Sequence, residues 1–284
     1  MPAARPTPAR TTPVATYRHY LMCEPVHYTV SYEINPWMDV TRATDTALAL
    51  RQWHALRETY LDLGHTVETI EPLEAYPDMV YAANGATVAG GVVYSAKFRY
   101  AERGAEGPAY QKWFADRGYV THTAAETNEG EGDLLVVGDL ILAGTGFRTE
   151  RAAHAEAQEL FGLPVISLEL VDPHYYHLDT ALAVLSSDVD APQIAYYPPA
   201  FSTGSRAVLA ELYPDAIVAT ERDAVALGLN AVSDGRNVVI APGAVDLAAA
   251  LTERGYVPLP VDTSELLKGG GGAKCCTLEI RDAR

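Results

Sequence analysis

Two adjacent cysteines, Cys275 and Cys276, lie close behind a run of four glycines near the C-terminus. Glycine lets the backbone adopt conformations that other residues avoid and lets it approach a neighbouring group closely. A thiol beside backbone amides and the cation of Lys274 can have a lowered pKa, and the thiolate is the form that attacks carbon. The segment therefore favours Cys275 as a nucleophile, while two small core cysteines beside a loose loop are the alternative interpretation.

A histidine and a carboxylate alternate in the stretch from His174 to Thr180. On a β-strand alternate side chains lie on one face, so His177 and Asp179 are expected to point the same way. A histidine that transfers protons, next to a carboxylate that holds a cation, would form a catalytic pair. A core histidine with satisfied hydrogen bonds is the alternative. The spacing of His174 and His177 also occurs in metal sites, but no third cluster of ligands accompanies them, so no metal is predicted.

Three carboxylates alternate immediately before a strongly apolar stretch: Glu129, Glu131 and Asp133. On one face of a strand they would repel one another, which is costly unless a cation binds between them. That cation could be a metal ion or a guanidinium group. An exposed acidic turn is the alternative interpretation.

Four further polar residues interrupt apolar surroundings. Asn84 ends the stretch Val80-Tyr-Ala-Ala, and Asn35 lies within Ile-Asn-Pro-Trp. Arg148 follows the segment Gly144-Thr-Gly-Phe, and Arg103 lies with Arg99 on either side of Tyr-Ala-Glu. Arginine pairs with a carboxylate through two parallel hydrogen bonds, so Arg148 and Arg103 are candidates for binding a substrate carboxylate.

The elements that must position these residues recur along the chain as a helix, a breaker and a strand. The breakers are Gly64, Gly118, Gly162, Pro214 and Gly255. Apolar periodicity predicts helices over 45–63, 110–117, 151–161, 205–213 and 246–254, each leading to a strand at 65–70, 119–123, 165–170, 216–219 and 256–261. Five such units predict five structural repeats of an α/β protein. Further strands are predicted at 92–98, 134–143, 181–186, 193–197, 237–241 and 277–280.

Composition limits the kinds of partner. The 284 residues carry a formal net charge of −16, which disfavours nucleic acid and anionic membranes as partners because both require positive charge. Three cysteines and no long apolar run predict a cytoplasmic protein without a transmembrane helix.

Residues 1–15 are predicted to be a flexible tail and residues 16–284 a single catalytic domain. The oligomeric state stays open, with a homo-oligomer as one alternative.

Taken together, these segments resemble the guanidine-modifying enzyme superfamily, which includes arginine deiminases, dimethylarginine dimethylaminohydrolases, arginine dihydrolases and amidinotransferases. The resemblance covers the chain from about Tyr20 to Ile280. Three motifs carry it in the family's order: Glu-Gly-Glu-Gly-Asp (129–133), His-Leu-Asp-Thr (177–180) and the glycine-rich turn before Cys275. It implies a five-fold pseudo-symmetric α/β propeller (pentein fold), a small guanidino compound as substrate, and no metal or organic cofactor.

The resemblance also implies roles for individual residues. Cys275 is similar to the family's nucleophile, His177 to its general acid and Asp179 to a guanidinium anchor. The family's common Glu-Gly-Gly-Asp has one residue fewer than this sequence, so either Glu129 or Glu131 matches the family glutamate. Glu131 is favoured as the catalytic glutamate, with Asp133 binding substrate beside it.

The substrate-binding residues come from the same resemblance. Arg148 and Arg103 resemble arginines that bind the substrate α-carboxylate. Asn84 stands where many hydrolases of the family have aspartate, and together with Asn35 it resembles the arginine dihydrolase branch.

The implied reaction is hydrolysis of arginine or N-methylated arginine through a covalent Cys-thiouronium intermediate, which releases citrulline or ornithine. Amidino transfer to an amine acceptor and a non-catalytic guanidino-binding protein are the alternatives.

Overall fold

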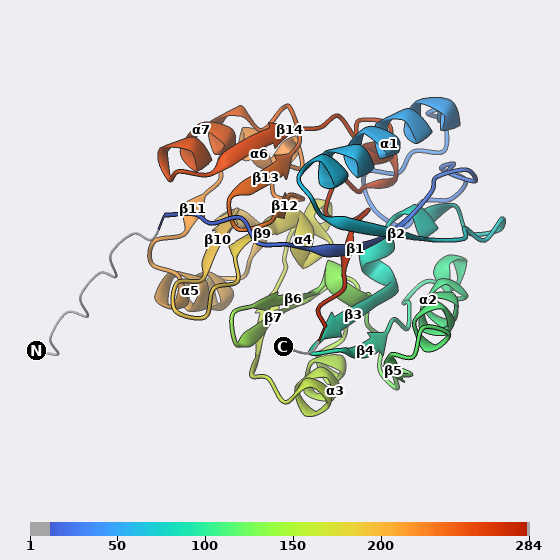
Figure 1. The fold of residues 1–284 in the computed structure, drawn as a ribbon, viewed down its shortest axis with the longest axis horizontal. Helices are drawn as coiled ribbons and strands as arrows, with labels where there is room; N and C mark the ends of the chain where they lie inside the picture. The colour runs from blue at the N-terminus through green and yellow to red at the C-terminus, as the bar shows by residue number, and fades with distance from the viewer. Residues whose placement is uncertain (1–11, 283–284) are drawn as a thin grey trace, which may run out of the picture.

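Five three-stranded β-sheets follow one another around a common centre, and helices cover the outside of the ring (Figure 1). The computed structural model describes residues 12–282. Helices α1 (Thr46–Asp62), α2 (Glu106–Ala115), α3 (Arg151–Phe161), α5 (Thr203–Leu212) and α7 (Val245–Glu253) lie around the periphery in Figure 1. The predicted five-fold α/β propeller is therefore confirmed. Most of the predicted tail, residues 1–11, lies outside the described part of the chain.

Every unit has the same strand order. An inner strand pairs antiparallel with a middle strand, and the middle strand pairs parallel with an outer strand that follows the unit's helix. A parallel pair needs a crossover connection, which the helix provides. The first four sheets are β3 (Ala86–Ala89), β4 (Val92–Ser95) and β5 (Val120–His122); β6 (Leu134–Val137), β7 (Leu140–Thr145) and β8 (Val165–Glu169); β9 (Leu182–Ser186), β10 (Gln193–Tyr196) and β11 (Ile217–Val218); and β12 (Val232–Ser233), β13 (Asn237–Ile240) and β14 (Val257–Pro260).

The fifth sheet closes the ring by joining the two ends of the chain. Strand β1 (His19–Cys23) pairs parallel with β2 (Thr66–Ile70) and antiparallel with β15 (Leu278–Glu279). The inner strand of this sheet thus comes from the C-terminus, while its other two strands come from the N-terminal part. Because β15 begins three residues after Cys275, ring closure also fixes the position of the cysteine turn.

The helix predicted over residues 45–63 shows how local sequence determines these units. Asp45 caps α1 by accepting a hydrogen bond from the backbone N–H of Leu48 at 2.9 Å. The predicted apolar face is buried, with Trp53 and Leu56 fully inaccessible. Full burial of such a side chain contributes about 1.5–3 kcal/mol, which attaches the helix to its sheet. Among residues 12–282, no helix has the length and apolar character needed to span a membrane.

Two predictions of strands were wrong. The stretch 134–143 is a hairpin of β6 and β7 rather than one strand, because Gly138 turns the chain at a φ of 63°. His177 and Asp179 do not lie on a strand either. The short helix α4 (Leu178–Ala181) begins directly after His177, and the strand β9 starts only at Leu182.

Candidate active site

The cysteine turn brings the Cys275 thiol into a buried polar site. Gly270 has a φ of 92°, and a Cβ at this position would lie 2.8 Å from oxygens of Asn35 and Tyr176. Only glycine suits this backbone and this close approach, which explains part of the glycine run. The Cys275 side chain is 1% exposed, and its Sγ donates a hydrogen bond to Oδ2 of Asp179 at 3.3 Å. The side-chain amide of Asn230 donates to the same sulfur at 3.1 Å.

The environment of this thiol is suited to receiving a cation. Burial, followed by the charge of Asp179, raises the pKa of the Cys275 thiol well above its usual range. Burial also raises the pKa of Asp179 to about 6, although His177 and Lys274 act in the opposite direction. The Oδ1 atom of Asp179 has no hydrogen-bond partner in the described part of the chain. A cation bound here would stabilise both the carboxylate and a thiolate.

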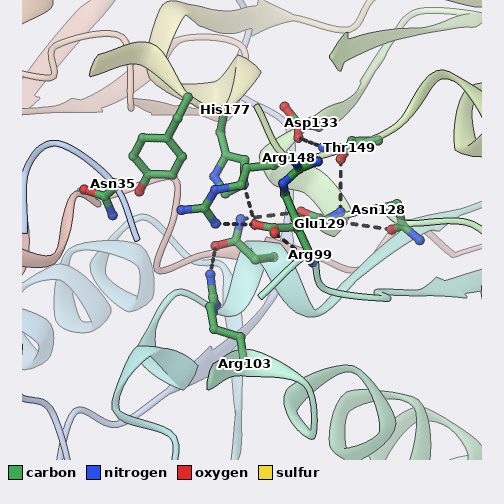
Figure 2. A network of polar contacts seen from close by, with 12 residues as sticks. Asn35, Arg99, Arg103, Asn128, Glu129, Asp133, Arg148, Thr149 and His177 are labelled. Carbon is green, nitrogen blue, oxygen red and sulfur yellow. Dashed lines mark hydrogen bonds and ion pairs between the residues drawn. The ribbon is translucent and has the colours of Figure 1, made fainter. Parts of the chain in front are cut away.

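His177 and Glu129 form a second pair of candidate catalytic residues, in addition to Cys275 and Asp179. The Nε2 of His177 lies 2.7 Å from Oε2 of Glu129, and the same oxygen accepts a hydrogen bond from Arg148 at 2.8 Å (Figure 2). Burial favours a raised pKa for Glu129, but Arg148 and the His177 hydrogen bond outweigh it and hold the pKa well below its usual range. Glu129 is thus an ionised acceptor. The Nδ1 of His177 finds no partner among residues 12–282.

The preference for Glu131 over Glu129 is not supported by this geometry. Residues Gly130–Gly132 form a 3₁₀ turn rather than a strand, so alternate side chains do not share a face. Glu131 accepts hydrogen bonds from Lys274 at 2.7 Å and from Arg281, and His177 is not among its hydrogen-bond partners. The Lys274 ammonium therefore donates to Glu131 and to the carbonyl of Thr277 rather than to the Cys275 sulfur, which differs from the sequence-based interpretation.

Asp133, predicted to bind substrate, is hydrogen-bonded to the backbone in this structure. Its two oxygens accept backbone N–H groups, Oδ1 from Leu178 at 3.0 Å and Oδ2 from Thr149 at 3.3 Å. Leu178 follows His177 and Thr149 follows Arg148, so the carboxylate ties together the two segments that carry these side chains. Asp133 thus has the contacts of a positioning residue rather than of a substrate ligand.

The remaining predicted residues surround the same site. Arg103, labelled in Figure 2, donates to Oδ1 of Asn84 at 2.8 Å. It also forms a buried ion pair with Glu106 at 2.7 Å. Arg148 lies near the Tyr100 and Tyr176 rings, and its Nη2 donates to the carbonyl of Ile34. Asn35 is only partly buried and donates to the carbonyl of Gly269 at 3.0 Å, which joins the loop before α1 to the cysteine turn.

Sequence reasoning missed one residue of the site, Asn230. The available signal was a single polar side chain inside the apolar run Ala226-Leu-Gly-Leu-Asn-Ala-Val, the pattern of a buried polar group. No group of three or more His, Cys, Asp or Glu side chains arranged to hold a metal ion occurs within residues 12–282.

Gly132 provides a test of how tightly the site is packed. A Cβ at this position would collide with the amide nitrogen of Asn84 and would lie 3.2 Å from the His177 ring. We expect Gly132→Ala to lower kcat/KM by about 10²-fold, because a displacement near 1 Å is enough to misalign reacting groups. Steady-state kinetics and thermal denaturation would be measured together. Gly204→Ala is the matched control, since a Cβ there meets nothing within 4 Å. Equal kinetics in the two variants would contradict the packing argument.

Comparison with known proteins identifies relatives across almost the whole chain. An N(G),N(G)-dimethylarginine dimethylaminohydrolase of Mycobacterium tuberculosis is 55% identical over 274 residues, which cover 96% of this chain and 89% of that protein. The bifunctional arginine dihydrolase/ornithine cyclodeaminase ArgZ of Synechocystis is 35% identical over 269 residues. That match covers 92% of this chain but only 37% of ArgZ. No protein-family model matches the chain.

A solved structure shares the fold. The N-terminal domain of ArgZ, crystallised as a cysteine-to-serine mutant bound to its substrate, superposes with a TM-score of 0.87 at 33% identity. The similarity covers 93% of this chain and 98% of that domain. The similarity therefore extends over almost all of that N-terminal domain.

Proposed function

Because the chain belongs to the guanidine-modifying enzyme superfamily, we propose that it hydrolyses a carbon–nitrogen bond of the guanidinium group of arginine or N-methylated arginine. The observation that carries the proposal is the contact between Cys275 Sγ and Asp179, with His177 and Glu129 in the same buried site. A nucleophile, a cation-binding carboxylate and a proton carrier are the three groups that this reaction needs.

The first half of the reaction forms a covalent intermediate. Asp179 holds the planar guanidinium, and the Cys275 thiol passes its proton to His177. The resulting thiolate attacks the central carbon of the guanidinium to form a C–S bond. His177, oriented by Glu129, gives its proton to the departing nitrogen as the C–N bond breaks. A neutral amine leaves and a positively charged thiouronium remains on Cys275.

The second half restores the enzyme. His177 takes a proton from water, and the resulting hydroxide adds to the thiouronium carbon. The C–S bond breaks, the thiolate is released, and the remaining proton passes to the amine that left in the first half. The net reaction converts a guanidinium and water into a ureido compound and an ammonium ion. By their resemblance to carboxylate-binding arginines of the family, Arg148 and Arg103 are proposed to pair with the α-carboxylate at the other end of the substrate.

Two substrates are favoured by different observations. The relative with 55% identity is named for dimethylarginine, which would give citrulline and dimethylamine. Asn84, and the similarity to the arginine dihydrolase domain of ArgZ, favour arginine with a second cycle that gives ornithine. A methyl group or two changes binding by only about 1–3 kcal/mol, so small rearrangements of the pocket decide between them.

Product analysis tests the function and separates the two substrates. The purified protein would be incubated with arginine and with dimethylarginine, and citrulline, ornithine, ammonia and dimethylamine would be measured by mass spectrometry. Citrulline with dimethylamine assigns a dimethylargininase, and ornithine with ammonia assigns an arginine dihydrolase. Amidino transfer would instead consume arginine only when an amine acceptor is added. Failure to convert either compound would refute the proposed hydrolysis.

The pH dependence of this activity follows from Asp179. The carboxylate must be ionised to hold the guanidinium, and its pKa in the folded protein is raised to about 6 by burial. Activity is therefore present above that pH and is lost as the pH falls through it. We expect kcat/KM to decrease about tenfold per pH unit below pH 6, as a single ionisation requires. An Asp179→Asn variant should show low activity without this acid limb. An unchanged acid limb in the variant would assign the ionisation to another group.

We also propose that the reaction takes place in the cytoplasm. The described part of the chain contains three free cysteines, which fits a reducing cytoplasmic compartment. Homo-oligomerisation is proposed as well, and light scattering of the purified protein would measure it.

A further inference from the structure

The side chain of Asn230 connects the sulfur of Cys275 to the backbone around it. Its Nδ2 donates to Cys275 Sγ and to the carbonyl of Asp179, both at 3.1 Å. Its Oδ1 accepts the backbone N–H groups of Cys275 and Gly272, both at 3.0 Å. The side chain is 1% exposed, so these four contacts are made away from solvent.

These contacts determine the orientation of the amide. An amide nitrogen cannot accept hydrogen bonds, so the two backbone N–H donors identify the atom facing them as Oδ1. The N–H₂ group must then face the sulfur and the carbonyl of Asp179. Asn230 therefore presents a hydrogen-bond donor to Cys275.

The chain before Asn230 holds this amide in place. Helix α6 (Glu221–Val225) begins with a capping box in which Thr220 and Asp223 bond reciprocally. Leu227 follows with a φ of 52°, the one positive value at a non-glycine among the described residues, and its carbonyl accepts the N–H of Asn230 at 3.0 Å. A rare backbone conformation persists where surrounding structure enforces it, and such positions concentrate at functional sites.

The chemistry of the thiol gives this donor a role. The S–H of Cys275 is directed at Asp179, and once its proton is lost, sulfur and carboxylate repel each other. Among residues 12–282, the side-chain N–H that donates a hydrogen bond to this sulfur is that of Asn230. A donor to a charged acceptor forms a stronger hydrogen bond than a donor to a neutral one.

We infer that Asn230 is a further catalytic residue, whose amide N–H stabilises the Cys275 thiolate before attack and again when the C–S bond breaks. The inference rests on the proposed function in that it takes Cys275 as the nucleophile. It concerns both half-reactions, because a thiolate is the attacking group in the first and the leaving group in the second.

Alkylation of the thiol tests this without requiring turnover. Asn230→Asp keeps the acceptor for the two backbone N–H groups and replaces the donor by an oxygen. The rate of Cys275 modification by iodoacetamide at about pH 8, followed on the Cys275 peptide by mass spectrometry, should fall at least about tenfold, which corresponds to one unit in the pKa of the thiol. Asn237→Asp is the matched control, since the side-chain amide of Asn237 on β13 is also a hydrogen-bond donor, in this case to the carboxylate of Asp234 at 2.7 Å. Its alkylation rate should equal that of the wild type even if its melting temperature falls.

Asn230→Ala separates loss of the donor from introduction of a charge. Asn230 acts on the sulfur, so kcat should fall at least about tenfold while KM changes less than about threefold. Wild-type alkylation rates in both variants would overturn the inference. A wild-type protein that converts no guanidino compound would refute the proposed function, whereas the alkylation comparison would still decide the role of Asn230.

Discussion

A Cys275→Ser variant is expected to remain folded and to lose at least about 10⁴-fold in kcat on its guanidino substrate. The serine hydroxyl has nearly the size of the thiol and can still contact Asp179 and Asn230, so the thermal midpoint should change little. A hydroxyl ionises far less readily than a thiol, and its attack on the guanidinium carbon would be correspondingly slow. Steady-state kinetics, and mass spectrometry of the intact protein for the covalent adduct, are the measurements.

Cys276→Ser is the matched control for this variant. Cys276 is also fully buried, but the side-chain hydrogen bonds to Asp179 and from Asn230 are made by the sulfur of Cys275 and not by that of Cys276. We expect a modest loss of stability, about 1 kcal/mol, with kcat within a factor of about three of wild type. A covalent adduct on Cys276, or near-normal turnover by Cys275→Ser, would show that the nucleophile had been assigned to the wrong cysteine.

Glu129→Gln and Glu131→Gln are expected to have opposite effects on activity and stability. Glu129 accepts hydrogen bonds from both His177 and Arg148, so its neutral replacement should lower kcat about 10³-fold, within the range of acid–base catalysis. Glu131 pairs with Lys274 and Arg281 outside the catalytic group. Its replacement should cost about 3 kcal/mol of unfolding free energy, as for removal of one partner of a buried ion pair, and leave kcat nearly unchanged.

Kinetics and chemical denaturation of the two variants, measured side by side, decide between the glutamates. The same substitution is made two residues apart, so any general effect of removing a carboxylate cancels in the comparison. A large loss of kcat in Glu131→Gln together with a small loss in Glu129→Gln would restore the choice that the sequence alone had favoured.

The architecture was largely predictable because its units are locally encoded. The helix predicted over 151–161 has those bounds in α3, and the breakers Gly64, Gly118, Gly162 and Gly255 all have positive φ values. Apolar periodicity and helix-terminating glycines depend on residues a few positions apart, which a sequence displays directly. The resemblance then placed Cys275, His177 and Asp179 in one site, and the fold brings all three together.

Orientation inside the site was decided by tertiary contacts. Glu129 and Glu131 are two residues apart in one acidic turn, and the 3₁₀ conformation of Gly130–Gly132 directs one side chain to His177 and the other to Lys274. Asp133 was predicted to bind substrate, but its oxygens are occupied by backbone N–H groups of two other segments. These partners lie far away in the sequence, so no local pattern specifies them.

Cys275 shows the same division between local sequence and tertiary structure. The sequence by itself determined that a thiol follows a glycine-rich turn, in a chain of five repeated units with a histidine and carboxylates in a family's order. Only the tertiary structure decided what surrounds that thiol: Asp179, and Asn230 from 45 residues away, with Lys274 turned aside to Glu131. The physical reason is that hydrophobic periodicity acts over a few residues, whereas a buried polar group takes whichever partner the fold brings within about 3 Å of it.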